Sequence, residues 1–362
     1  MKVDTITCHD VYNHGASLQA FALQEYLRSQ GHDAAIIDYK PDYLTGYLRL
    51  DDVNPAYDKP VIKWLYIIAK LPSRLPRRWA FDRFTRRHLE LTGRFHSNDE
   101  LKAYPPRADV YIAGSDQIWN TLFPNGKDPA FYLDFVPEGC KRISYAASFA
   151  TESIAEDSIP FVSEHLAGLD AVSVRESTSL PLLKRLGRDD GVAVCDPCFL
   201  LDATFWSRFA GKRRRGPRYL VVYDFEKSPR VQEIVLQIAK EKWLVIYNIG
   251  PYKMPYADRN YTASGPERFV QLVRDADFVV SNSFHATVFA MIFHRPFCVI
   301  NRTEQINERM KSLLQDVHLP DRVVSRFGKG LFSPIDYDAD DAVLLQKAEA
   351  SKQYLNDNLS LQ

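Results

Sequence analysis

The sequence predicts an α/β protein built from two units with parallel sheets. Short apolar runs, typical of buried strands, alternate along the chain with segments whose apolar residues recur at helical spacing. Polar, glycine-containing turns follow several of these runs, as they do where parallel strands end. A basic stretch, residues 212–216, separates an earlier series of such elements from a later one. With 362 residues, the chain is long enough for two domains of ordinary size.

The earlier series opens with a strand–loop–helix–strand unit. Residues 3–7 are expected to form the first strand and residues 35–38 the second. Between them, an apolar stripe marks one face of a helix that Gly31 ends. The polar loop at residues 13–17 lies where open α/β sheets bind ligands, although a plain turn is the alternative. Further strands are expected at residues 109–113, 143–147, 172–176 and 192–194.

Residues 42–104 are less regular, and part of this stretch is aromatic and basic. An apolar run that begins at Trp64 is followed by seven basic residues from Lys70 to Arg87. Such a segment can contact an anionic membrane surface or a lipid-linked pyrophosphate. The alternative is helical packing with solvated arginines. Peripheral contact with the membrane is therefore one of two interpretations of this segment.

The later series alternates in the same way and ends in two helices. Strands are expected at residues 218–223, 243–247, 278–280 and 297–300. A helix is expected over residues 302–314, and a final helix over residues 340–357 is expected to return to the first domain. We therefore predict an N-terminal domain at residues 1–205, a C-terminal domain at residues 206–335 and a returning helix within residues 336–362.

One ionisable side chain, His285, falls in the first turn of the helix that follows the strand at residues 278–280. Ser281, Asn282 and Ser283 form the polar turn before it and have N-cap chemistry. Helix N-termini attract anions, because free N–H groups and the helix dipole point there. An imidazole beside a bound anion can donate a proton near neutral pH. The alternative is a histidine that only helps to cap the helix.

Composition argues against several classes of function. Lysine plus arginine and aspartate plus glutamate both number 46, so the formal charge is zero, which argues against a dedicated nucleic-acid-binding protein. No apolar run approaches the length of a transmembrane helix, and the first residues lack the apolar core of a signal peptide. Five cysteines indicate a reducing compartment, so we expect a cytoplasmic protein. Cys195 and Cys198 have metal-knuckle spacing without a second pair, so we expect no metal and no cofactor.

Five motifs, taken in this order, resemble those of the polysaccharide pyruvyl transferase family. They are Asn13-x-Gly15-x-x-Leu18-Gln19, Gly114-Ser-Asp-Gln-x-Trp119, Ser173-Val-Arg-Glu176, Asp196-Pro-x-x-Leu-Leu201 and Ser281-x-Ser-Phe-His285. The resemblance implies a fold similar to the glycosyltransferase-B type, in which two Rossmann-like domains face a cleft. It also implies transfer of a pyruvyl group from phosphoenolpyruvate to a pair of sugar hydroxyls, which forms a ketal on a cell-surface polysaccharide or its lipid-linked precursor.

The resemblance also assigns roles to individual residues. It implies His285 as the general acid and Asp116 as a base or acceptor-orienting group, although Asp116 could equally cap its loop. The donor is expected at Arg175, Ser281, Asn282, Ser283 and Arg309. The sugar acceptor is expected at Asn13, Gly15, Gly114, Ser115, Gln117 and Trp119, with core packing as the alternative for Trp119.

One position departs from the family pattern. The arginine of an Arg-Leu-His element in characterised relatives falls on Ser283, whereas the histidine is retained as His285. Phosphoenolpyruvate carries a carboxylate and a phosphate, so its site needs fixed cations. Arg175 and Arg309 are expected to supply them.

Two other functions stay open on the sequence. A nucleotide-sugar glycosyltransferase of the same fold would need a carboxylate that grips the donor ribose, and the loose candidates are Asp224, Glu226 and Glu267. A non-catalytic, sugar-binding descendant would explain the loss of the arginine at Ser283 but not the retention of His285. The acceptor sugar itself is not specified by any motif.

Overall fold

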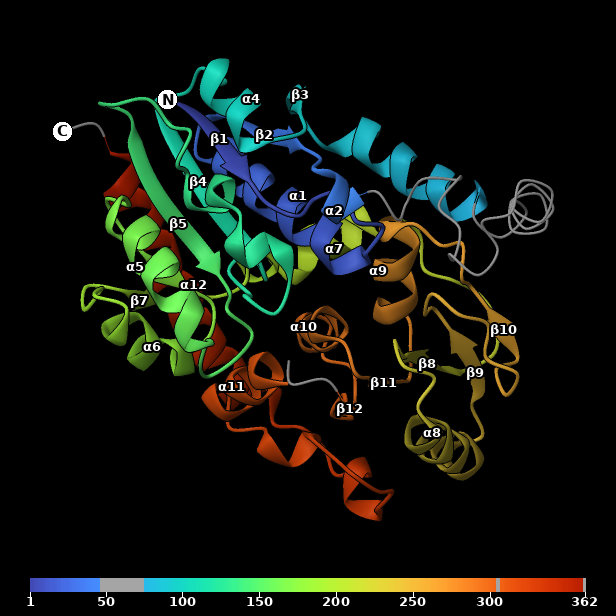
Figure 1. The fold of residues 1–362 in the computed structure, drawn as a ribbon. Helices are drawn as coiled ribbons and strands as arrows, with labels where there is room; N and C mark the ends of the chain where they lie inside the picture. The colour runs from blue at the N-terminus through green and yellow to red at the C-terminus, as the bar shows by residue number, and fades with distance from the viewer. Residues whose placement is uncertain (46–74, 304–306, 361–362) are drawn as a thin grey trace, which may run out of the picture.

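The structure, a computed structural model, describes residues 1–45, 75–303 and 307–360 (Figure 1). The apolar run at Trp64 and the first basic residues after it therefore lie outside the described residues. Two parallel sheets, each covered by helices, make up the described chain. The predicted α/β class with parallel sheets is confirmed.

The first sheet has seven strands in the order β3-β2-β1-β4-β5-β6-β7, and all neighbours pair in parallel. The order reverses direction between β1 and β4, which is where open α/β sheets leave a crevice for ligands. The strands are β1 (Lys2–Ile6), β2 (Asp33–Tyr39), β3 (Leu91–Phe95), β4 (Val110–Asp116), β5 (Lys141–Ala147), β6 (Ser173–Val174) and β7 (Val192–Ala193). The strand predicted at 172–176 is shorter than expected and comprises Ser173–Val174, although the Arg175 amide still donates to the Ala147 carbonyl of β5.

The second sheet has five parallel strands in the order β10-β9-β8-β11-β12. Its central strand β8 is buried along its whole length, as apolar runs in parallel sheets are. The strands are β8 (Tyr219–Tyr223), β9 (Val245–Asn248), β10 (Arg259–Asn260), β11 (Phe278–Ser281) and β12 (Phe297–Val299).

The helices cover both sheets and fill the space between them. They are α1 (His14–Ser29), α2 (Asp42–Thr45), the helix at residues 75–88, α4 (Asn98–Ala103), α5 (Ile159–Ala167), α6 (Leu180–Arg185), α7 (Ala203–Phe209), α8 (Pro229–Lys242), α9 (Pro266–Arg274), α10 (Phe284–Ile292), α11 (Glu308–Asp316) and α12 (Tyr337–Leu359). The structure starts α11 at Glu308, later than the predicted residue 302, and the Asn307 side chain before it hydrogen-bonds to the backbone N–H and carbonyl of Arg302. Among the described residues, no helix combines the length and apolar character needed to cross a bilayer.

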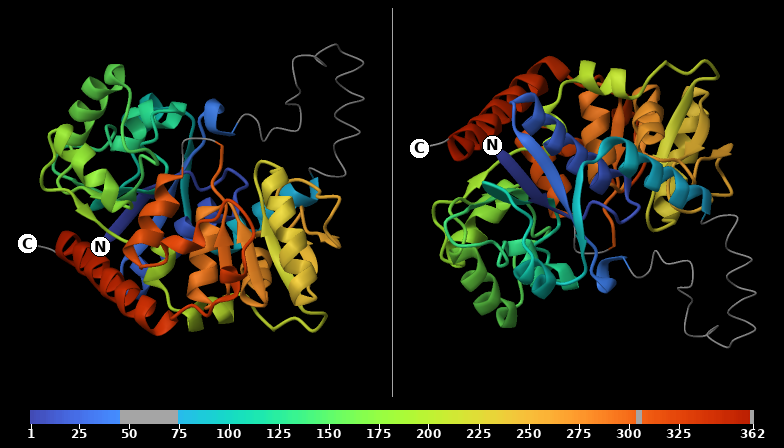
Figure 2. Two further views of the ribbon diagram at one scale, coloured as in Figure 1. Left: turned by 90° about the horizontal axis from the view of Figure 1, so that it is seen from below. Right: turned by 90° about the horizontal axis from the view of Figure 1, so that it is seen from above.

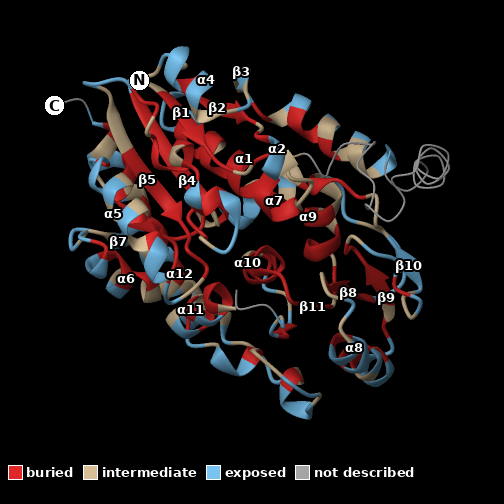
Figure 3. Ribbon diagram, viewed as in Figure 1, coloured by how far each residue is buried: buried red, intermediate tan, exposed pale blue. Residues whose placement is uncertain are grey.

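The two sheets are joined by one shared apolar cluster. Phe21 of α1, Trp206 of α7, Phe269 of α9 and Phe289 of α10 belong to a single buried cluster. Figure 3 shows α1, α9 and α10 as mostly buried helices in the middle of the molecule. An amphipathic helix would expose one face, whereas α10 buries eight of its residues and so lies entirely inside. The first turns of α1 and α10 therefore meet within the protein.

Helix α12 runs along both units (Figure 2). At its start, the Tyr337 hydroxyl donates to the carbonyl of Arg295 in the second unit. Farther along, the Tyr354 hydroxyl donates to the carbonyl of Ser144 in β5. Leu355 and Leu359 at its end belong to the core cluster that also contains Val3 of β1. The helix therefore completes the core of the first sheet.

Candidate active site

The turn between β11 and α10 is built by its own polar side chains. The Ser281 hydroxyl donates to the Tyr223 carbonyl and accepts from the Ser283 amide, both at 2.9 Å. The Asn282 side chain accepts from the amide of Phe225 and donates to Asp224. Ser281 and Asn282, predicted to bind the donor, thus spend their hydrogen bonds on the turn. Their effect is to fix the position from which α10 presents His285.

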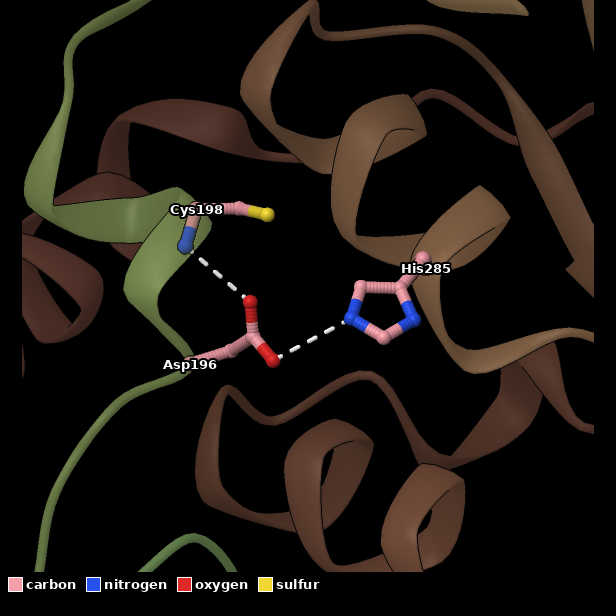
Figure 4. A group of neighbouring side chains, drawn as sticks. All are labelled: Asp196, Cys198 and His285. Carbon is pink, nitrogen blue, oxygen red and sulfur yellow. Dashed lines mark hydrogen bonds and ion pairs between the residues drawn. The ribbon is translucent and has the colours of Figure 1, made fainter. Parts of the chain in front are cut away.

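His285 faces a carboxylate of the other unit. Its Nε2 lies 3.3 Å from Oδ2 of Asp196, and the residue is only 5% exposed (Figure 4). Asp196 is itself fixed, because Oδ1 accepts the backbone N–H of Cys198 at the start of the short helix Pro197–Leu200. Burial alone would raise the pKa of Asp196, but His285 and Arg175 outweigh it and hold the pKa below its usual range. An ionised Asp196 can orient the imidazole and stabilise its protonated form.

Gly15, in the first turn of α1, packs directly against this imidazole. A Cβ atom at position 15 would lie 2.0 Å from Nδ1 of His285 and 2.8 Å from its Cβ. No side chain fits there without moving His285. The glycine was predicted to bind the acceptor, but its contact is with the candidate general acid.

Arg175 is surrounded by three carboxylates. Its guanidinium lies 3.1 Å from Glu176, 3.1 Å from Asp196 and 3.6 Å from Asp116, and it stacks 4.3 Å from the centre of the Phe284 ring. Burial would lower the pKa of Arg175, but these carboxylates together raise it above its usual value. The charge of Arg175 is therefore already neutralised within the protein. It ties the first unit to the turn that carries His285.

Arg309 of α11 is less completely neutralised. Its Nη1 lies 3.7 Å from Asp116, and the amide oxygen of Gln117, turned towards it, accepts at 2.9 and 3.0 Å. Burial and the like charge of Arg175 lower the pKa of Arg309 to about 10, although Asp116 opposes this. A buried guanidinium whose nearest carboxylate is 3.7 Å away is a ready partner for an added anion.

Asp116 lies between these two guanidinium groups. Its Oδ1 is the atom that approaches both Arg175 and Arg309. The residue ends β4 with a φ of 75°, in the left-handed region that side chains rarely adopt. The site therefore joins Asp116, Arg175 and Asp196 of the first unit to His285 and Arg309 of the second.

Comparison with known families decides how this arrangement is to be classified. Residues 13–304 match the family model described as polysaccharide pyruvyl transferase. The chain belongs to this family. The matched stretch contains every residue of the cluster except Arg309, which lies just beyond it. No curated protein matches the sequence.

Solved structures resemble this pyruvyl transferase family member in fold. A Listeria monocytogenes protein assigned as a UDP-N-acetylglucosamine 2-epimerase is 11% identical, with a TM-score of 0.54, over 98% of this chain and 94% of that chain. S. aureus MnaA, solved with UDP, is 12% identical, with a TM-score of 0.50, over 98% of this chain and 95% of that chain. Glycosyltransferase SsfS6 of Streptomyces sp. SF2575, solved with thymidine diphosphate, is 13% identical, with a TM-score of 0.44, over 98% and 99%. At such identities the likeness shows the fold alone, which is the glycosyltransferase-B type.

In the structure of this family member, most of the predicted acceptor residues contact the protein's own backbone or core. Asn13 caps α1 by accepting from the Gly15 amide, and Ser115 donates to the Ala146 carbonyl. Gly114 has a φ of 132°, and a Cβ there would lie 2.0 Å from the Tyr145 carbonyl oxygen. The Asn13 oxygen and the Ser115 hydroxyl hydrogen, which were expected to contact a sugar, thus bond to the protein's own backbone.

The proposed sugar-stacking role of Trp119 needs correction. Trp119 is 0% exposed, its ring stacks on Tyr132 at 5.5 Å, and its Nε1 donates to the Phe131 carbonyl. The ring therefore belongs to the core of the first unit, where no sugar reaches it. Gln117 is the exception among the predicted acceptor residues, since it contacts Arg309 across the interface.

Three buried side chains of the cluster could in principle hold a metal. Asp196, Cys198 and His285 each place one ligand atom within 4.8 Å of the others. However, Oδ2 of Asp196 already faces the Arg175 guanidinium at 3.1 Å, which repels a divalent cation. Burial and the charge of Asp196 raise the pKa of the Cys198 thiol well above its usual value, which disfavours the thiolate that a metal requires. These residues fit a hydrogen-bonded cluster better than a metal centre.

The three carboxylates considered for gripping a nucleotide ribose are engaged elsewhere. Asp224 accepts backbone N–H groups of Glu226 and Ser228. Glu226 accepts from Thr303, and Glu267 pairs with His88 at 3.2 Å. The geometry therefore gives no support to a ribose-binding carboxylate at these positions.

Proposed function

We propose that this chain transfers a pyruvyl group from phosphoenolpyruvate to two hydroxyls of a sugar, forming a ketal on a cell-surface polysaccharide or its lipid-linked precursor. The family supports the reaction class. The observation that carries the assignment within this chain is the buried contact of His285 with Asp196, next to the guanidinium groups of Arg175 and Arg309. A proton donor and cations on one interface match the needs of an anionic enol donor.

Arg309 is the principal donor-binding residue in this proposal. Phosphoenolpyruvate brings two anionic groups, and the ion pair that Arg309 makes with Asp116 is long, at 3.7 Å. Arg175 is already paired with three carboxylates, so its role is to hold Asp196 and Phe284 in place. An anionic group of the donor competes with Asp116 for the space between the two guanidinium groups. This proposal therefore gives the two arginines different roles, whereas both were expected from the sequence to bind the donor.

The reaction divides into two additions at one carbon atom. His285 gives its proton to the methylene carbon C3 of the donor, and a sugar hydroxyl oxygen forms a bond to C2 as that hydroxyl loses its proton. The bond from C2 to the phosphate oxygen then breaks, and the second hydroxyl oxygen bonds to C2. One of the two hydroxyl protons in effect replaces the one given by His285, and the other leaves with inorganic phosphate. Asp196 stabilises the imidazolium from which the first proton comes.

Access to this site requires movement at the interface. Arg175, His285 and Arg309 are each less than a tenth exposed. The residues come from both units, so opening the interface exposes the site and closing it excludes water from the reactive intermediate. The closed arrangement is thus the one in which chemistry takes place.

The helix at residues 75–88 suits contact with the inner face of the membrane. It exposes Leu75 and Trp79, the latter by 57%, and carries exposed arginines such as Arg83 and Arg87 beside them. An exposed tryptophan among arginines matches an anionic headgroup surface or the pyrophosphate of a lipid-linked acceptor. In this proposal the enzyme works in the cytoplasm and meets its acceptor at that surface.

Calorimetric titration of phosphoenolpyruvate tests the donor assignment. Arg309→Met should weaken binding by about 1.5–3 kcal/mol, the usual size of a charge-assisted hydrogen bond. Arg175→Met should weaken binding less but should lower stability, because it removes the cation that pairs with the buried carboxylates of Glu176 and Asp196. Arg185→Met, an exposed arginine of α6 paired with Glu156, is the matched control. Donor affinity unchanged in Arg309→Met would refute the proposal.

A further inference from the structure

A pocket of about 400 Å³ lies where the carboxyl ends of the two sheets meet. Thr151, Glu152 and Ser153 of the first unit line one side, and Thr303, Glu308 and Lys311 of the second line the other. The residues of the first unit follow β5, and Thr303 follows β12. In open α/β sheets, ligands bind outside the carboxyl ends of the strands.

The pocket adjoins the buried cluster through shared elements. Glu308 precedes Arg309 in α11, so the same helix turn serves the pocket and the cluster. On the opposite side, β5 ends at Ala147, which pairs with Asp116 of β4, and the chain then runs directly to Thr151. A ligand in the pocket would therefore lie next to a donor bound at Arg309.

The charge of the residues that line the pocket favours the sugar acceptor over the anionic donor. Two carboxylates, Glu152 and Glu308, face the pocket against one ammonium group, that of Lys311. A trianionic donor is repelled by such a lining. Neutral hydroxyls suit it, because carboxylates accept strong hydrogen bonds from them and the lining adds threonine and serine hydroxyls.

We propose that this pocket binds the acceptor as a neutral sugar, with Glu152 and Glu308 accepting hydrogen bonds from its hydroxyls and Glu308 taking the proton of the attacking one. This inference rests on the proposed function, whose acceptor site it defines. As the hydroxyl oxygen bonds to C2 of the donor, its proton passes to the Glu308 carboxylate, while C3 receives its proton from His285. That proton passes from Glu308 to the phosphate oxygen as its bond to C2 breaks, and the proton of the second hydroxyl replaces the one given by His285.

The environment of Glu308 supports the role of a base. Glu308 is 9% exposed, and its nearest cation is Lys311 at 3.9 Å. Burial and the hydrogen bond and negative charge of Glu152 raise the pKa of Glu308 above its usual value. A carboxylate with a raised pKa is a better acceptor for a hydroxyl proton near neutral pH.

A larger pocket, of about 500 Å³, is a weaker candidate for the acceptor. It lies beside the first sheet, and the described residues that line it all belong to the first unit. Its charged groups also pair with one another: Asp82 accepts from Tyr12 and faces Arg78, and Lys40 contacts Asp10. A sugar held there would contact residues of one unit only. Asp82 nevertheless gives a matched carboxylate for a control.

Saturation-transfer NMR with methyl glycosides of glucose, galactose, mannose, N-acetylglucosamine and N-acetylmannosamine tests the pocket. We expect at least one glycoside to bind the wild type at millimolar concentration. Glu308→Ala should weaken that binding by about tenfold or more, the loss expected for a hydrogen bond to a charged group. Glu308→Gln keeps a hydrogen-bonding oxygen and should bind the glycoside nearly as well, yet lose about a hundredfold or more in phosphate release. Asp82→Asn should alter neither.

Three outcomes would overturn this inference. They are the absence of binding by every glycoside, binding that survives Glu308→Ala, and binding lost in Asp82→Asn instead. Phosphoenolpyruvate titration of the same variants distinguishes this failure from failure of the proposed function. If the donor still binds through Arg309 while Glu308→Ala leaves glycoside binding intact, the pocket assignment is wrong and the reaction stands.

Discussion

Two buried histidines, His14 and His285, occupy the same kind of place in the two units and have opposite surroundings. Each lies in the first turn of a helix at the interface, His14 in α1 and His285 in α10. Both ring nitrogens of His14 have neutral partners, the Tyr223 hydroxyl at 3.0 Å and the Ser264 carbonyl at 2.9 Å. His285 instead faces the carboxylate of Asp196.

The comparison indicates that the side chain or carbonyl facing each histidine, and not its place at a helix terminus, determines whether it can act as a proton donor. Burial and the nearby charge of Arg77 lower the pKa of His14 to about 3, so His14 is neutral at physiological pH. Its ring stacks on Phe269 at 4.9 Å and joins the two units as a structural group. The Asp196 carboxylate gives His285 a partner that can stabilise an imidazolium. Only the second arrangement suits a proton donor.

Alanine at each position should produce the largest contrast. His285→Ala should lower the rate of phosphate release by about a hundred- to ten-thousandfold, the usual contribution of a general acid, and leave the fold intact. His14→Ala should keep most of the rate but unfold at lower urea concentration, because it removes two buried hydrogen bonds. Steady-state kinetics and urea unfolding of both variants measure this. More than about a tenth of wild-type activity in His285→Ala would remove it as the acid.

Removing the carboxylate should make His285 resemble His14. Asp196→Asn leaves the Arg175 guanidinium without one of its partners, and breaking a buried ion pair costs about 3–5 kcal/mol. The lowered pKa of Asp196 means that its stabilising contribution is present above the unfolded pKa of about 3.9 and is lost as pH falls below that value. The variant should therefore be less stable near neutral pH and should converge with the wild type in acid. Equal free energies of unfolding at neutral pH would contradict this pairing.

A methyl group at Gly15 should disturb His285 without changing its partner. Gly15→Ala brings Cβ within 2.0 Å of Nδ1, and the backbone or the ring must shift. Misplacement of a catalytic group by about 1 Å costs on the order of a hundredfold in rate, whereas overpacking costs about 1–3 kcal/mol in stability. Gly93→Ala, where no atom lies within 4 Å of the new Cβ, is the control. A crystal structure of Gly15→Ala with His285 unmoved and the rate unchanged would disprove the argument.

The smallest expected effect is on the pH dependence of stability, and it is specific to His14. The pKa of His14 is lowered from 6.5 to about 3, so the unfolded chain binds its proton first as pH falls. Neutral His14 therefore makes its full contribution to the free energy of unfolding above pH 6.5. Below that pH the contribution decreases by roughly 1.4 kcal/mol per pH unit, down to the pKa of His14 in the folded state. His14→Gln, which keeps a neutral donor and acceptor, should lack this part of the slope. Urea unfolding of both proteins between neutral and mildly acidic pH measures the difference, and parallel curves would show that folding does not lower the pKa of His14.

The sequence predicted the fold because strand and helix signals are local. Apolar runs and helical spacing predicted two units with parallel sheets, which the structure confirms. The order of the strands could not be predicted, because pairing depends on contacts between distant segments. The start of α11 was predicted too early for a related reason, since the hydrogen bonds between the Asn307 side chain and the Arg302 backbone leave no signal in the apolar pattern.

The site was predicted less evenly than the fold. The motifs drew attention to Asp116, Arg175 and His285, and the missing arginine at Ser283 drew attention to Arg309; the structure brings all four into one cluster, and their roles remain predictions. Asp196 was noticed only as part of a motif, because its pairing with His285 spans two units and leaves no local pattern. Whether a polar side chain binds a ligand or the protein backbone also depends on contacts between distant segments, which the sequence does not show.

The course of α12 has a consequence for how the protein is made. The second sheet is assembled from residues 219–299, whereas the core around β1 includes Leu355 and Leu359 from the last turns of α12. During synthesis, β1 can therefore complete its core only after residues 355–359 have emerged from the ribosome, by which time all strands of the second sheet have been made. Truncation within α12 would remove apolar side chains from the opposite unit and leave β1 and β5 with an uncovered face, which a chaperone or protease can recognise.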